Sequence, residues 1–232
     1  MIVLMSAFLL LSAFSCGGGN KANSTSEQDE KTVVNVPQFD ADSAYLYVKN
    51  QVDFGPRVPN TKEHVACGNY LAGKLEAFGA KVTNQYADLI AYDGTLLKAR
   101  NIIGSYKPES KKRIALFAHW DTRPWADNDA DEKNHHTPIL GANDGASGVG
   151  ALLEIARLVN QQQPELGIDI IFLDAEDYGT PQFYEGKHKE EAWCLGSQYW
   201  SRNPHVQGYN ARFGILLDMV GGKDATFFKE VY

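Results

Sequence analysis

Acidic residues and a histidine stand at the ends of short apolar runs in this chain. The runs cover residues 114–118, 170–173 and 213–217, and a carboxylate follows each of them within three residues. Another acidic residue lies in a glycine-flanked loop at 141–145. Short apolar runs bounded by turn signals predict buried parallel strands, and ligands bind outside the carboxyl ends of such strands. We therefore expect five side chains in one crevice. They are His119, Asp144, Glu176, Asp177 and Asp218.

The residue types in this group predict a metal site that includes a general base. Glu176 and Asp177 are adjacent at a strand end and point in different directions, so one can bind a metal ion while the other faces substrate. Asp144 precedes a predicted helix, whose N-terminus favours negative charge. A single Asp after a strand is more often a helix cap. Several such strand ends in one sheet favour a functional acidic site instead.

An acidic residue lies near His119 on the same predicted strand. Asp121 is two residues away and points the same way, so it can orient the imidazole of a metal-ligating His119. Asp218 can bind a metal, orient a ligand or hold a substrate amine. The remaining histidines are expected at the surface. They are His64, His135, His136, His188 and His205.

The elements that must position this site alternate between strands and helices. Residues 81–86 and 99–106 flank a turn and are expected to pair antiparallel. The other predicted strands cover 113–121, 168–174 and 213–218. Four helices are predicted. The first begins at a cap at Asp40 or Asp42, and the second runs from a cap at Asn60 or Thr61 to Gly79. The third covers 148–162 and the fourth 197–202. Residues 123–137 and 178–191 are expected to be polar loops.

This order predicts the α/β class, a single-domain three-layer α/β/α fold with a mixed, mostly parallel central sheet. The chain stops at Tyr232, shortly after a central strand. A helix that should follow and cover the sheet is absent. We therefore expect the sequence to be truncated at its C-terminus.

The N-terminal segment predicts export. Residues 2–14 are almost wholly apolar, too few to span a bilayer, and typical of the core of a signal peptide. The residues before Cys16 resemble a loose lipobox, and a polar tract follows to residue 35. We expect a signal peptide at 1–15, a flexible tether at 16–35 after a lipidated Cys16, and the catalytic domain at 36–232. The alternative is an ordinary secretory signal with an incidental cysteine. The expected location is the bacterial periplasm or cell envelope.

The composition and charge of the chain limit the kinds of partner that it can bind. The net charge of −7 argues against nucleic acid, which would need a basic patch, and a bound cation would neutralise part of it. Membrane contact is expected only through the lipid anchor, and nothing indicates an oligomeric state. Nothing brings Cys67 and Cys194 together, so both are expected to be free, partly buried thiols.

Five motifs carry a resemblance. Residues 54–59 (FGPRVP), 119–125 (HWDTRPW), 141–148 (GANDGASG), 174–177 (DAED) and 216–221 (LLDMVG) resemble the zinc aminopeptidase-like exopeptidase superfamily. Within it they look most like the glutaminyl cyclase branch, the glutaminyl-peptide cyclotransferases of animals and Bacteroides-type bacteria. The resemblance covers residues 36–232, and the combination of motifs is specific.

The resemblance implies a role for each site residue. Asp144 and Asp177 match two zinc ligands, although many members carry Glu at the second position, and Glu176 matches the catalytic acid/base. Asp218 matches a residue that supports catalysis in the cyclases and binds a second zinc in the aminopeptidases, where His119 is the other ligand. The family's remaining zinc-binding histidine lies C-terminal to Tyr232, and no residue here matches it.

Three functions follow as hypotheses. The first is a cyclase with one Zn²⁺ that converts the N-terminal glutamine of peptides or proteins to pyroglutamate and releases ammonia. The second is an aminopeptidase with two Zn²⁺ ions. The third is a tethered peptide-binding lipoprotein that has lost its metal, which the intact carboxylates argue against. Trp120, Trp125 and Trp193 are expected either to wall the substrate pocket or to serve simple packing.

Overall fold

The computed structural model describes residues 35–227, so the signal peptide, Cys16 and most of the tether lie outside the described residues. The α-helices are α1 (Ala41–Val52), α2 (Lys62–Ala77), α3 (Ala146–Gln161) and α4 (Leu195–Arg202). The strands are β1 (Lys81–Ile90), β2 (Leu96–Tyr106), β3 (Arg113–His119), β4 (Gly167–Leu173) and β5 (Gly214–Leu216). Two 3₁₀ turns, η1 (Glu132–Asn134) and η2 (Glu190–Ala192), lie in the loops.

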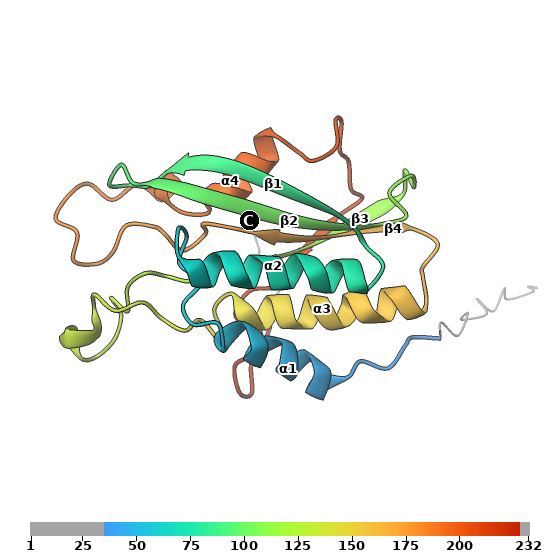
Figure 1. The fold of residues 1–232 in the computed structure, drawn as a ribbon, viewed down its shortest axis with the longest axis horizontal. Helices are drawn as coiled ribbons and strands as arrows, with labels where there is room; N and C mark the ends of the chain where they lie inside the picture. Colours follow the sequence, from blue (N-terminus) through green and yellow to red (C-terminus); the bar gives the residue numbers. More distant parts are fainter. Residues whose placement is uncertain (1–34, 228–232) are drawn as a thin grey trace, which may run out of the picture. The chain divides into compact units, whose positions relative to one another are not determined.

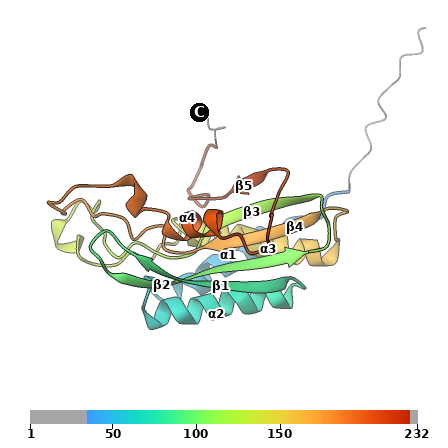
Figure 2. The same ribbon diagram turned by 90° about the horizontal axis from the view of Figure 1, so that it is seen from above.

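The five strands form one mixed sheet in the order β1-β2-β4-β3-β5. β2 is antiparallel to both β1 and β4, whereas β3 is parallel to both β4 and β5. Four strands therefore point the same way and only β2 opposes them. This confirms the predicted α/β fold with a mixed, mostly parallel sheet, and Figure 2 shows β5 beside β3.

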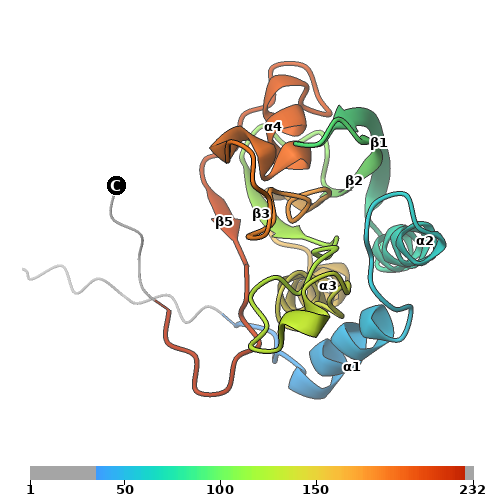
Figure 3. The ribbon, with the colours of Figure 1, turned by 90° about the vertical axis from the view of Figure 1, so that its left-hand side faces the viewer.

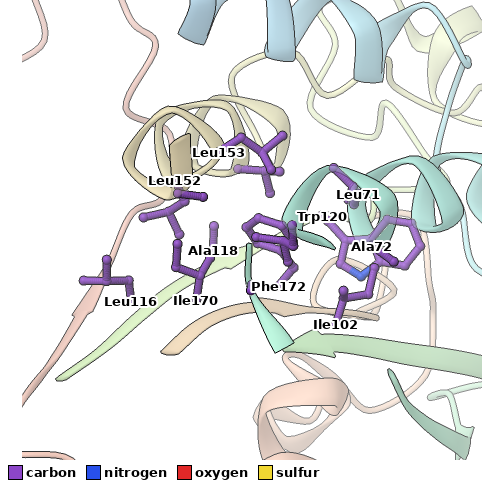
Figure 4. Close-up of a cluster of buried hydrophobic side chains, with 14 of the residues drawn as sticks. Leu71, Ala72, Ile102, Leu116, Ala118, Trp120, Leu152, Leu153, Ile170 and Phe172 are labelled. Atoms are coloured by element: carbon purple, nitrogen blue, oxygen red, sulfur yellow. The ribbon is translucent and has the colours of Figure 1, made fainter. Parts of the chain in front are cut away.

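Helices cover both faces of this sheet. α1, α2 and α3 lie together on one face, and α4 lies on the other (Figures 1 and 3). The main core forms between the sheet and the first three helices, where the apolar stripe of α3 packs on β3 and β4 (Figure 4). Its members include Leu71, Leu152, Leu153, Ile170 and Phe172, all 0% exposed. No helix among residues 35–227 is long and apolar enough to cross a membrane.

The prediction that residues 123–137 form a polar loop at the surface is partly wrong. Arg123 and Asp127 are 7% and 4% exposed. The Arg123 guanidinium donates two hydrogen bonds of 2.6 Å to the Asp127 carboxylate and others to the carbonyls of Asp177 and Thr180. A charged residue can be buried when its partners are all supplied, which polarity along the sequence does not reveal.

Close contact between α3 and the segment after β5 depends on one glycine. A Cβ added at Gly148 would lie 2.1 Å from the carbonyl oxygen of Leu217, whereas one added at Gly73 in α2 would meet nothing within 4 Å. We expect Gly148→Ala to lower the free energy of unfolding by about 1–3 kcal/mol, because backbone must move. The matched control, Gly73→Ala, should raise it by about 0.5–1 kcal/mol. Urea denaturation checks both values, and equal effects would contradict the close packing.

Candidate metal centre

The site residues lie at the carboxyl ends of the three parallel strands. His119 is the last residue of β3, the turn after β4 carries Glu176 and Asp177, and Asp218 follows β5 by two residues. Asp144 lies in the loop before α3. The structure brings these five side chains to one edge of the sheet, as the strand-end pattern predicts.

His119 lies at the middle of the group. Its Nε2 is 2.9 Å from Oδ1 of Asp144 and 3.4 Å from Oδ1 of Asp218. Its ligand atoms also lie within 4.8 Å of those of Asp144 and Asp177 in one set, and of those of Glu176 and Asp218 in another. The His119 side chain is 1% exposed, whereas those of Asp144 and Asp218 are 36% and 33% exposed. The centre therefore opens to solvent on the side of these two aspartates.

The donor set fits a zinc ion. One imidazole and several carboxylates offer the nitrogen and oxygen ligands that Zn²⁺ takes. Oδ2 of Asp177 is buried and has no hydrogen-bond partner. Because a buried carboxylate oxygen without a partner is costly, a bound cation would supply the partner that this oxygen lacks.

Asp121 ties the acidic turn to β3. It is 0% exposed, and its two oxygens accept the backbone N–H groups of Glu176 and Asp177 at 3.1 Å each. Oδ1 also lies 3.4 Å from Nδ1 of His119. One carboxylate thus orients the imidazole, as the sequence predicts, and also fixes the two acidic residues after β4, which the sequence does not predict.

The loop that carries Asp144 is held from two directions. On one side, Arg57 is fully buried and donates to the carbonyls of Trp120, Leu140 and Gly141 at 2.7–3.1 Å. On the other side, the Asn143 side-chain oxygen accepts from Gly221 N, just past Asp218. These bonds join the segments around β3, α3 and β5 into one frame.

Burial and neighbouring charges shift the pKa values of the acidic groups in the centre. Burial, followed by the charges of Asp121, Asp218 and Asp144, raises the pKa of Glu176 to about 7. Burial and the same kind of repulsion raise the pKa of Asp177 to about 8. A carboxyl group with a pKa near neutrality suits a residue that both accepts and donates a proton.

The pKa of His119 and the pKa of Asp218 shift in opposite directions. Burial alone lowers the pKa of His119, but its contacts with Asp121, Asp144 and Asp218 outweigh burial and raise the pKa well above its ordinary value. The contact with His119 lowers the pKa of Asp218. The raised pKa of His119 and the lowered pKa of Asp218 both favour the ion pair between these two side chains.

These shifts predict that metal removal makes stability depend on pH. A carboxyl group whose pKa is higher in the folded than in the unfolded chain stabilises the fold at low pH, and this contribution is lost as pH rises through the folded value. Glu176 and Asp177 act in this sense between about pH 4 and about pH 8, and the raised pKa of His119 adds in the same sense. Zinc requires deprotonated ligands. We expect the rise in unfolding temperature on adding zinc to be larger at about pH 8 than at about pH 5. A rise of the same size at both pH values would contradict the prediction.

Of the two roles expected for the three tryptophans, pocket wall or simple packing, Trp120 has the packing role. Trp120 is 0% exposed, stacks on His64 and donates its indole N–H to Arg100 O at 3.1 Å, so it belongs to the core rather than to a pocket wall. Trp125 and Trp193 are half-buried and both contact Arg123, whose guanidinium carbon lies 5.6 and 4.6 Å from their rings. Trp125 also lines a hollow of about 300 Å³ that reaches Asp144.

Sequence reasoning missed several residues around the centre. Arg57 falls in the resembling motif at 54–59, yet its inward position shows only in three dimensions. The surface prediction is wrong for His64 and His205, whose side chains are each 3% exposed. His64 contacts Asp174, which is 0% exposed. Cys67 and Cys194 are free, as predicted; Cys194 is partly buried, whereas Cys67 is fully buried.

A mixed α/β sheet with a histidine and carboxylates at the ends of its parallel strands defines a protein of the zinc exopeptidase type. The chain matches Peptidase family M28 over residues 101–232. It therefore belongs to Peptidase family M28.

Solved structures of high similarity carry two descriptions. The chain is 97% identical to a glutaminyl cyclase from Bacteroides thetaiotaomicron, bound to N-acetylhistamine, with a TM-score of 0.85 over 85% of this chain and 68% of that one. It is 98% identical to a leucine aminopeptidase precursor from Bacteroides thetaiotaomicron VPI-5482, with a TM-score of 0.83 over 84% of this chain and 67% of that one.

A curated relative comes from an animal. The chain is 25% identical to the glutaminyl-peptide cyclotransferase of Drosophila melanogaster over 193 residues, which are 79% of this chain and 50% of that protein. The chain spans about half the length of the curated relatives it matches. The similarities to the Bacteroides thetaiotaomicron cyclase and to the Drosophila melanogaster cyclotransferase agree with the predicted glutaminyl cyclase branch.

Proposed function

We propose that the whole protein is a zinc-dependent glutaminyl-peptide cyclotransferase that acts on the N-terminal glutamine of peptides or proteins. The 97% identity to the Bacteroides thetaiotaomicron glutaminyl cyclase carries this proposal. The Drosophila melanogaster relative supports the same activity. The strand-end centre supplies the carboxylates that this chemistry needs.

Asp144 and Asp177 would hold the zinc ion, with His119 and Asp218 beside them in the network. A bound Zn²⁺ polarises a substrate carbonyl as a Lewis acid. Asp177 fits the ligand role because its Oδ2 is buried and unpartnered. Asp121 keeps His119 and Asp177 in place, since one of its oxygens contacts the His119 imidazole and the other accepts the backbone N–H of Asp177.

Glu176 would move the proton. It takes a proton from the substrate's α-amine as that nitrogen attacks the γ-carbonyl of the glutamine, and then delivers it to the departing ammonia. Both steps need a carboxyl group that changes its protonation state easily, and the burial that raises the pKa of Glu176 favours this behaviour. Trp125, at the rim of the hollow beside Asp144, and Trp193 would wall the substrate pocket.

A two-zinc aminopeptidase is the second candidate, because His119, Glu176 and Asp218 form another group of ligand atoms within 4.8 Å of one another. In that case His119 and Asp218 would hold a second ion and Glu176 would activate a water. The products separate the two functions. The full-length protein is incubated with a peptide that begins with glutamine. Ammonia and a pyroglutamyl peptide support the cyclase, whereas a free amino acid and a shortened peptide contradict it.

We also propose that the protein is exported and anchored at the cell envelope through a lipid on Cys16, with the catalytic domain at 36–232 joined by the tether at 16–35. The apolar residues 2–14 and the polar tract after Cys16 support this location. Mass spectrometry of the N-terminal peptide from cells tests it. An acylated Cys16 is expected, and a mature chain that begins elsewhere would contradict the anchor.

A further inference from the structure

A buried histidine outside the metal centre contacts the strand that carries the centre's acidic turn. His64 lies in the first turn of α2, where its backbone N–H is capped by the Thr61 hydroxyl. Its side chain is 3% exposed. Nε2 lies 2.9 Å from both carboxylate oxygens of Asp174, and the imidazole stacks on Trp120 with 4.3 Å between ring centroids.

Asp174 controls the start of that acidic turn. It follows the last residue of β4 and is 0% exposed. Its carboxylate accepts the backbone N–H of Arg100 at 2.6 Å and that of Ala175 at 2.8 Å. His64 supplies the third contact, and it is the one side-chain contact that the structure describes for this carboxylate.

Ala175 holds an unusual backbone conformation between Asp174 and the centre. Its φ of +51° lies in the left-handed region, which is unfavourable for a residue with a Cβ and persists where surrounding contacts enforce it. The carboxylate of Asp174 supplies one of these contacts, through the Ala175 N–H. The two residues that follow are Glu176 and Asp177, so the angle at Ala175 sets where both carboxylates lie.

We propose that His64 is a positioning residue for Glu176 and Asp177, acting through its hydrogen bond to Asp174. Without this bond the buried carboxylate of Asp174 lacks one hydrogen-bond partner and rearranges to find another. This rearrangement weakens its bond to the Ala175 N–H and loosens the turn. The expected effect of His64 on turnover rests on the proposed function. Its expected effect on zinc binding does not.

Two substitutions separate the hydrogen bond from the stacking. His64→Phe keeps an aromatic ring against Trp120 and removes the donor. His64→Gln keeps an amide N–H near the position of Nε2 and removes the ring. His64→Asn, whose amide is too short to reach Asp174, replaces the Phe variant if that variant does not fold.

His205 offers a matched control. It is also a buried imidazole, 3% exposed at its side chain, with Nε2 3.9 Å from Asp169 near the start of β4, the strand end opposite Asp174. It accepts a hydrogen bond from the indole of Trp200 at 3.2 Å. His205→Phe therefore removes a comparable buried contact without touching the acidic turn.

The full-length variants are compared for zinc affinity by chelator competition, for unfolding temperature, and for kcat and KM. His64→Phe is expected to weaken zinc binding by about tenfold and to lower kcat by at least about tenfold, with KM changed less than about threefold. His64→Gln should keep both values within about threefold of the wild type, and His205→Phe should lower only the unfolding temperature.

The inference is overturned if His64→Phe binds zinc like the wild type, if the Gln variant loses as much as the Phe variant, or if His205→Phe has the same effect on zinc. Should the wild type release no ammonia, the proposed function fails. The order of zinc affinities among the variants still decides the role of His64.

Discussion

Glu176→Gln is expected to lower turnover of a glutaminyl peptide by about 10²–10⁴-fold, the usual range for loss of a general acid/base. The amide cannot accept the proton of the attacking amine, yet it fills nearly the same space. The Glu176 N–H would still donate to Asp121, so the turn should stay in place. Zinc affinity is therefore expected to change little.

The comparison that makes this result specific is Asp177→Asn, which should lose zinc and activity together. Asp177 has the buried, unpartnered oxygen that a cation would satisfy. Steady-state ammonia release and zinc content are measured on both variants. Full activity in Glu176→Gln would remove Glu176 from its proposed role.

Asp121→Asn is expected to lower zinc affinity by about 10–100-fold and the free energy of unfolding by about 1–3 kcal/mol. The carboxylate accepts two backbone N–H groups, those of Glu176 and Asp177, on separate oxygens. An amide has one oxygen, so its NH₂ group would face an N–H donor. The turn would then move away from His119.

Asp169→Asn is the matched control for this variant. Asp169 is also 0% exposed, and it accepts hydrogen bonds from Arg113, Ser105 and Tyr209 near the start of β4. Its loss should destabilise the fold to a similar degree and leave zinc affinity intact. Equal loss of zinc affinity in both variants would mean that general destabilisation, rather than the contacts of Asp121, explains the effect.

The strand ends could be predicted because two simple rules act together there. An apolar run defines a buried strand, and the carboxyl ends of parallel strands share an edge, so His119, Asp177 and Asp218 had to lie close together. The boundaries were accurate to within a few residues, with β4 at Gly167–Leu173 against a predicted 168–174. Helix α3 begins two residues before the predicted start.

The framework behind the centre could not be predicted, because it consists of buried polar residues. Arg57 and His64 have no apolar periodicity that would mark them as buried, and their partners are 63 to 110 positions away in the sequence. For Trp120 the sequence leaves two roles open, a wall of the pocket or simple packing. An aromatic residue beside a catalytic motif suits a pocket or a core equally, and only the stacking on His64 decides for the core.

We propose that one zinc ion, held by Asp144 and Asp177, serves a cyclase. A crystal structure of the full-length zinc-loaded protein, with anomalous data collected at the zinc absorption edge, tests this proposal. We expect one peak at about 2.0–2.2 Å from a carboxylate oxygen of each of these two residues. A second peak between His119 and Asp218 would contradict it and favour the two-zinc aminopeptidase.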